Sequence, residues 1–146
     1  MGAKPSEKVA VCATVDPDAN ATGAFTTDYI SMVDFQQAMF VVMAGVIAAS
    51  GTLDFSINEA TTATGAGATT LASGTLSITQ MTTADNDEQA VVNVETEDLS
   101  TGFDFVAGVM TLTTAGADSA VIGLGLLPRY GPGSDNDLAS VGEITG

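Results

Sequence analysis

The stretch TLDFSIN, residues 52–58, alternates strictly between polar and apolar side chains. Successive side chains of a β-strand point to opposite faces, so Leu53, Phe55 and Ile57 are expected to share one buried face. Residues 89–95 repeat the pattern, and Val, Ile and Thr, whose branched side chains suit a pleated sheet, are frequent throughout. No window of about 12 residues shows a convincing helical period. The sequence therefore predicts a chain built from β-strands.

Turn-forming residues interrupt these patterns at short intervals. Asp16-Pro17-Asp18-Ala19-Asn20 is a clear example, because Asp, Asn and Pro favour the backbone angles of turns. About eight strands at this spacing predict an all-β fold, a jelly-roll-like antiparallel β-sandwich. A single helical turn is expected at residues 95–99. The expected strands are 8–15, 27–33, 38–47, 51–59, 73–81, 89–95, 103–114 and 119–127.

The length of 146 residues fits one domain better than two. We expect a β-sandwich domain over residues 9–130, preceded by an N-terminal arm of residues 1–8. The Gly- and Asp-rich residues 131–146 are expected to form a C-terminal tail. Alternation in the first strand predicts one apolar face made by Val9, Val11, Ala13 and Val15.

The charge of the chain is strongly one-sided. It has 18 Asp and Glu residues against 3 Lys and Arg, which gives a net charge of −15. No basic residue occurs between Val9 and Pro128, where 14 of the acidic residues lie. Nucleic acids and anionic membranes normally require a basic patch, so we expect neither as a partner. The unpaired carboxylates are expected to be solvated or to face a basic partner.

The residues needed for most enzyme chemistry are missing. With no His and a single Cys, the chain has neither a His-based catalytic triad nor the ligands of a structural zinc site. The segment Asp16-x-Asp18-x-Asn20 begins like a calcium loop, but Ala21 and Thr27 replace the Gly and Glu that such a loop needs. We therefore predict no catalytic residue, no metal site and no cofactor, and the chain is not expected to be an enzyme.

Two further features bear on where the protein is found. The longest apolar run, residues 38–49, has 12 residues, whereas a membrane-spanning helix needs about 20. The first 30 residues lack the apolar segment of a signal peptide. We therefore expect a protein that is made in a cytoplasm, contacts no membrane and keeps Cys12 reduced and buried.

Residues 38–47 and 119–127 are apolar on both faces, unlike the usual strand of an antiparallel sandwich, which presents polar side chains to water. Either a loop covers the second face of each strand, or another protein subunit does. An uncovered apolar patch would be a liability in a soluble monomer. Arg129, the only basic residue outside the arm, offers a bidentate contact just beyond the second strand. The candidate interface residues are Met39, Val41, Met43, Ile122, Leu124, Leu126, Arg129 and Tyr130.

The order of several short segments is similar to that of a known group of proteins. Asp28-Tyr29-Ile30-Ser31-Met32 precedes an apolar strand, Gly102-Phe103-Asp104-Phe105-Val106 opens a later one, and Pro128-Arg129-Tyr130 follows the last. Over residues 26–130 this order resembles the small minor head proteins of tailed bacteriophages, often called decoration, cement or stabilisation proteins. The usual pattern of that family carries more Lys and Arg in the third and seventh strands.

The resemblance implies a structural virion protein without enzymatic activity. Such a protein would bind the outer surface of an icosahedral phage head, with the major capsid protein and further copies of itself, as homodimer or homotrimer, as its partners. The alternative is a β-sandwich adhesion or tail-associated binding module, calcium-dependent if the acidic turns hold ions.

Overall fold

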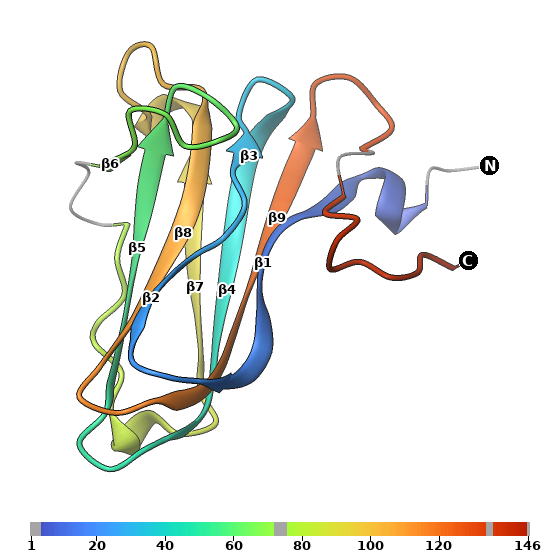
Figure 1. The fold of residues 1–146 in the computed structure, drawn as a ribbon. Coiled ribbons are helices and arrows are strands. Elements are labelled where there is room, and N and C mark those ends of the chain that lie inside the picture. Colours follow the sequence, from blue (N-terminus) through green and yellow to red (C-terminus); the bar gives the residue numbers. More distant parts are fainter. Residues whose placement is uncertain (1–3, 72–75, 134–135, 146) are drawn as a thin grey trace.

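The computed structural model describes residues 4–71, 76–133 and 136–145, and these residues form two antiparallel β-sheets packed face to face (Figure 1). The predicted all-β antiparallel sandwich is confirmed. Within these described ranges, three short 3-10 helices accompany the strands: η1 (Pro5–Glu7), η2 (Thr83–Asp85) and η3 (Thr96–Asp98). The strands are β1 (Val9–Asn20), β2 (Gly23–Thr26), β3 (Ile30–Ser31), β4 (Phe35–Ile47), β5 (Thr52–Ala60), β6 (Thr69–Thr70), β7 (Gln89–Glu95), β8 (Phe105–Thr113) and β9 (Ala117–Pro128).

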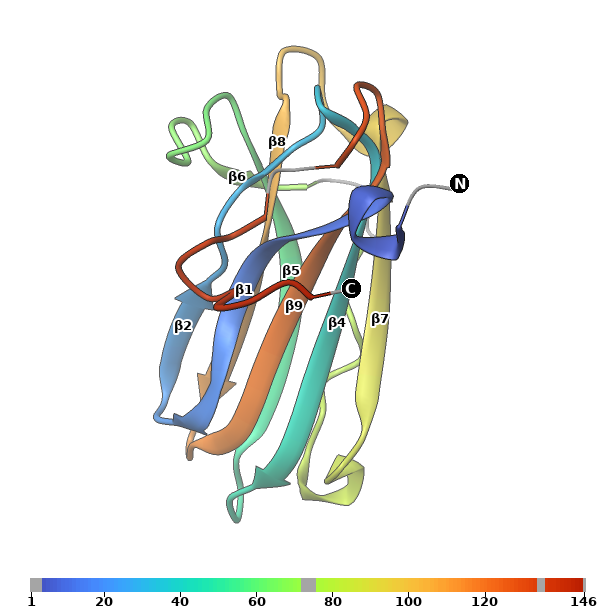
Figure 2. The same ribbon diagram turned by 90° about the vertical axis from the view of Figure 1, so that its right-hand side faces the viewer.

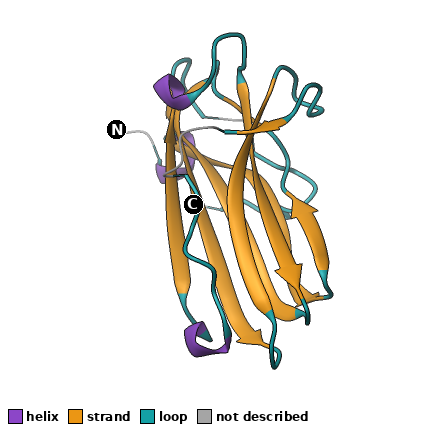
Figure 3. Ribbon diagram, turned by 90° about the vertical axis from the view of Figure 1, so that its left-hand side faces the viewer, coloured by secondary structure: helices purple, strands orange, loops and turns teal. Residues whose placement is uncertain are grey.

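The four-stranded sheet has the order β1-β9-β4-β7, and Figure 2 views it from the side that points away from the core. We call this side of the four-stranded sheet the outer face. The second sheet has the order β2-β8-β5-β6, with β3 also paired to β8. The strands dominate both layers, and loops join them at the two ends of the sandwich (Figure 3).

The first strand is longer and less regular than its sequence predicts. Val11 pairs with Leu124 and Ala13 with Gly123, so Cys12 is an extra residue in a β-bulge. The bulge turns the side chains that follow to the opposite face, so the expectation that Val9, Val11, Ala13 and Val15 share one face is wrong. Val9 and Val11 lie on the outer face, whereas Ala13 is fully buried between the sheets.

The segment predicted as a turn at residues 16–20 is instead the end of β1. A second register shift lies between Val15 and Asp18, and Pro17 falls within it. Proline has no backbone N–H to donate, so it is tolerated in a strand at an edge or a bulge, and both conditions hold here.

The boundaries of the other elements agree only in part with those predicted from the sequence. The single helical turn expected at 95–99 is confirmed as η3. Of the strand expected at 27–33, only Ile30–Ser31 is a strand, as β3, whereas β2 lies ahead of this range. Thr27 is tied to β8 by its own hydrogen bonds: Thr27 N donates to Gly108 O, and Gly108 N donates to Thr27 Oγ1. Of the strand expected at 73–81, residues 73–75 lie outside the described part. The rest forms only isolated bridges to β5, at Ser77 and Met81.

The core between the sheets is aromatic and aliphatic. Phe40 of β4 and Phe55 of β5 meet across it with their ring centroids 5.9 Å apart. Two glycines of β9 make room for such rings. A Cβ atom at Gly123 would lie 2.8 Å from Phe40, and one at Gly125 would lie 2.7 Å from Phe35. The outward side of β9 is therefore richer in large side chains than its inward side.

The C-terminal residues cross the outer face beside β1, as Figures 1 and 2 both show. Backbone and side-chain hydrogen bonds fix them there: Asp137 N donates to Val11 O at 2.7 Å, and Val11 N donates to Asn136 Oδ1 at 2.9 Å. Residues 136–145 thus cover part of an otherwise free sheet edge. Among the described residues, no helix is long and apolar enough to cross a membrane.

Candidate functional site

The candidate residues of the two double-sided strands lie side by side. In the register of β4 with β9, Met39 pairs with Leu124 and Val41 with Ile122. The side chains of directly paired residues are about 5 Å apart and share a face. Leu126 and Met43 extend the two rows in opposite directions along the strands.

Each of these six side chains is half-buried. By contrast, their neighbours Phe40 and Val42 are fully buried at the core. The predicted division of β4 into two apolar faces is therefore present. We define the apolar patch as the outward-facing, partly exposed apolar residues of the four strands: Val9, Val11, Met39, Val41, Met43, Val91, Ile122, Leu124 and Leu126.

Three members of the apolar patch were not among the sequence candidates. Val91 of β7 pairs with Val41 and is 55% exposed. Its position next to the inward-facing Val92 in an alternating strand is a signal that could have identified it. Val9 and Val11 precede the bulge at Cys12 and lie on the outer face because they pair with Leu126 and Leu124, and no local sequence signal indicates this pairing.

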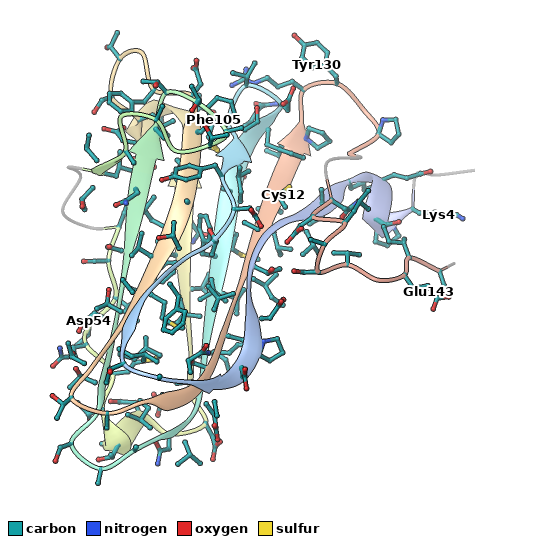
Figure 4. The ribbon with its side chains drawn as sticks, viewed as in Figure 1. Lys4, Cys12, Asp54, Phe105, Tyr130 and Glu143 are labelled. Carbon is teal, nitrogen blue, oxygen red and sulfur yellow. The ribbon has the colours of Figure 1, made fainter. Side chains whose placement is uncertain are left out.

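Arg129 and Tyr130 do not belong to the apolar patch. The backbone N–H of Arg129 donates to Asp34 O at 2.7 Å, and its guanidinium donates to Thr96 Oγ1 at 3.2 Å. Arg129 is thereby held at the end of the sheet where β9 finishes. Tyr130 lies in the loop beyond it and is 76% exposed (Figure 4). The structure therefore brings six of the eight candidate interface residues together in the apolar patch and places Arg129 and Tyr130 outside it.

The tail covers one side of the apolar patch but not its centre. Thr14 Oγ1 donates to Asp137 Oδ2 at 3.1 Å and also contacts Ser140 Oγ at 2.9 Å. Between the tail and the sheet remains a hollow of about 720 Å³, with Val141 on the tail side and Ile122 and Met43 on the sheet side. Polar contacts to β1, and not burial of a large apolar side chain, therefore hold the tail in place.

The contact between tail and body contains a group of carboxylates. Partial desolvation raises the pKa of Asp28 above its usual range, and the negative charge of Asp137 raises it further, with a smaller effect from Asp16. A carboxyl whose pKa is raised in the folded state favours folding when protonated. Its stabilising contribution is therefore present in acid and lost as the pH rises through the raised pKa of Asp28.

We expect Asp28→Asn to hold the tail more firmly at neutral pH and to flatten its pH dependence, because the amide carries no charge to repel Asp137. Hydrogen exchange of the amide of Asp137, which is bonded to Val11 O, measures tail attachment. In the wild type the protection of the Asp137 amide should increase as the pH falls from neutrality through the raised pKa of Asp28, after correction for intrinsic exchange. If the protection of the Asp137 amide depends on pH equally in the wild type and in Asp28→Asn, the charge of Asp28 does not loosen the tail. Asp104→Asn, in the loop before β8 and not among the charges that act on Asp28, is the control.

Comparison with models of known protein families gives no match, and comparison with curated proteins also gives none. Among the described residues, no three His, Cys, Asp or Glu side chains are grouped so that they could hold a metal ion. The most distinctive feature of the surface is therefore the apolar patch, which is suited to contact with another protein surface.

Proposed function

We propose that this chain is a non-enzymatic structural protein of a tailed-phage virion. It binds the outer surface of the icosahedral head, as a homodimer or homotrimer, and stabilises the lattice of the major capsid protein. The observation that carries the proposal is the contiguous apolar patch on the outer face of an otherwise acidic sandwich. The order of segments that resembles phage head decoration proteins supports the same function.

The size of the apolar patch fits a protein that acts in many copies. The apolar patch is three inter-strand spacings wide and about six residues long. These dimensions correspond to roughly 15 Å by 20 Å, or an area of about 300 Å². A stable pairwise complex usually buries about 800 Å² on each partner. One such patch therefore gives a modest affinity, and multivalent attachment to a lattice multiplies it. Because the protein binds the assembled lattice, it stabilises the shell by mass action.

The charge of the chain fits an outward position on a particle. A net charge of −15 on each of many copies would surround the head with negative potential. Like-charged particles repel each other and stay dispersed. The absence of basic residues between Val9 and Pro128 has the further consequence that the body of the protein does not compete for the packaged nucleic acid.

Co-sedimentation with head shells of the cognate phage tests the proposal. The wild-type protein should pellet with expanded shells and remain in solution with unexpanded ones, because only the expanded lattice presents the completed binding surface. Val33→Asp, at an exposed valine outside the apolar patch, should pellet like the wild type. Failure of the wild type to pellet with either form of shell would refute the proposed function.

Removal of divalent ions is expected to leave the protein unchanged. If the fold relies on its two-sheet core alone, the melting temperature should agree within about 1 °C with and without a chelator, since no bound ion contributes to the folded state. Differential scanning calorimetry in EDTA and in millimolar Ca²⁺ measures this. A rise of several degrees with Ca²⁺ would favour the alternative, a calcium-dependent adhesion or tail-associated module.

A further inference from the structure

The hollow between the tail and the outer face combines an apolar floor with an acidic rim. Its floor is formed by Val11 of β1, Ile122 of β9 and Met43 of β4, and Val141 of the tail closes one side. These side chains offer no hydrogen-bonding group to an occupant. An aliphatic side chain is therefore the chemistry that the floor accepts best.

Three carboxylates stand at the rim. Asp16 and Asp18 come from the end of β1, and Asp118 from the start of β9, and all three side chains are exposed. Asp18 accepts a hydrogen bond from the N–H of Ala19, and Asp16 Oδ1 lies 3.4 Å from Thr14 Oγ1, whose hydrogen is donated to Asp137. Within the part of the chain that the structure describes, none of the three lies in an ion pair with a basic side chain.

The basic residues of the chain lie far from this rim. Lys4 and Lys8 precede the first residue of β1, and Arg129 follows the last residue of β9. All three are at the opposite end of the sheet from the rim carboxylates. The seven strand residues that lead from Val9 to Asp16 span about 23 Å, which is more than twice the Debye length of about 8 Å at physiological salt. The negative potential at the rim is therefore not neutralised by the protein itself.

We propose that this hollow binds an aliphatic side chain of a partner segment that carries Lys or Arg on either side of it. The aliphatic group is buried against Ile122 and Met43, and the flanking cations face Asp16, Asp18 and Asp118. Within the hollow itself, as distinct from the centre of the apolar patch at Val41, a second copy of this chain fits less well, because it brings the same carboxylates to the rim. The inference rests on the proposed function, in which it specifies the kind of segment that the capsid lattice presents.

Titration of the full-length ¹⁵N-labelled protein with short peptides tests the inference. The probe is Ac-KLVLK-NH₂, compared with Ac-ELVLE-NH₂, which keeps the apolar core, and Ac-KSGSK-NH₂, which keeps the charge. We expect Ac-KLVLK-NH₂ to shift the amide signals of Val11, Ile122 and Val141, with an affinity at least tenfold above either comparison peptide. Equal binding of a comparison peptide, or shifts confined to other residues, would overturn the inference.

Two further measurements test the acidic rim and the identity of the occupant. The double variant Asp18→Asn and Asp118→Asn should weaken Ac-KLVLK-NH₂ binding at least fivefold, whereas the matched variant Asp54→Asn and Asp104→Asn should not. Raising NaCl from 20 to 500 mM should weaken peptide binding for the same electrostatic reason. If the amide signals of residues lining the hollow instead shift with protein concentration and without peptide, the occupant is a second copy of the chain. That result would overturn the inference.

The outcomes for this site and for the proposed function are distinguishable. Peptide binding without co-sedimentation would retain the hollow as a site and refute the role on phage heads. The opposite result is also possible: the double rim variant pellets with head shells like the wild type, and no peptide binds. That result would retain the role on phage heads and refute the hollow as the contact.

Discussion

If copies associate through the apolar patch, as proposed, Val41→Asp is expected to leave a folded monomer, with the dissociation constant of self-association raised at least a hundredfold. Val41 lies at the centre of the apolar patch, between Ile122 of β9 and Val91 of β7. In a contact between copies, a carboxylate there would lose its hydration without gaining a partner, and every copy would bring another like charge. A hundredfold change corresponds to about 2.8 kcal/mol, which is modest for a charge buried in this way.

Sedimentation velocity over a range of protein concentrations measures this effect. Val33 is 48% exposed but lies outside the apolar patch, so Val33→Asp controls for the added charge and should associate like the wild type. Because each copy carries a net charge of −15, association of the wild type should become tighter as salt screens the repulsion. A Val41→Asp protein that remains fully associated would exclude the apolar patch as the contact between copies.

Gly125→Ala is expected to destabilise the fold by about 3 kcal/mol and lower the melting temperature by about 10 °C. The new Cβ atom would lie 2.7 to 2.8 Å from three ring atoms of Phe35. Phe35 is itself 1% exposed, so its ring has no free space into which it could move. The sign of this change in stability is informative. Replacing glycine by alanine usually stabilises a protein, because alanine lowers the conformational entropy of the unfolded chain.

Thermal unfolding followed by circular dichroism measures this change. Gly142→Ala is the matched control, since a Cβ at Gly142 meets no atom within 4 Å, and it should shift the melting temperature by no more than about 1 °C. An unchanged melting temperature for Gly125→Ala would mean that β9 does not pack closely against Phe35.

Much of the fold follows from a period-two pattern that is local to each strand. The alternation in β5 and β7 predicts their inward faces, because every second side chain is turned to the core. The double apolar pattern of β4 similarly predicts Met39, Val41 and Met43 on a second apolar face. What the pattern does not contain is any information on pairing between strands that are far apart in sequence.

The remaining features depend on such long-range pairing. The bulge at Cys12 is defined by its partner strand β9 and not by its own neighbours, so the faces of β1 could not be read locally. Likewise, the hydrogen bond between Val11 and Asn136 joins residues 125 positions apart. The hollow and its acidic rim therefore emerge only when β1, β4, β9 and the tail are placed together.

Hydroxyl-radical footprinting of the protein bound to expanded head shells, compared with free protein diluted until it is monomeric, tests the central claim most directly. Met39 and Met43 are half-buried in the free protein and report on the apolar patch, whereas half-buried Phe105, on β8 of the other sheet, serves as reference (Figure 4). If the outer face is the assembly surface, oxidation of Met39 and Met43 should fall at least fivefold on binding, with Phe105 unchanged. Equal oxidation of both methionines in the free and the shell-bound protein would show that the apolar patch stays open to water, and would contradict the proposed role of the outer face.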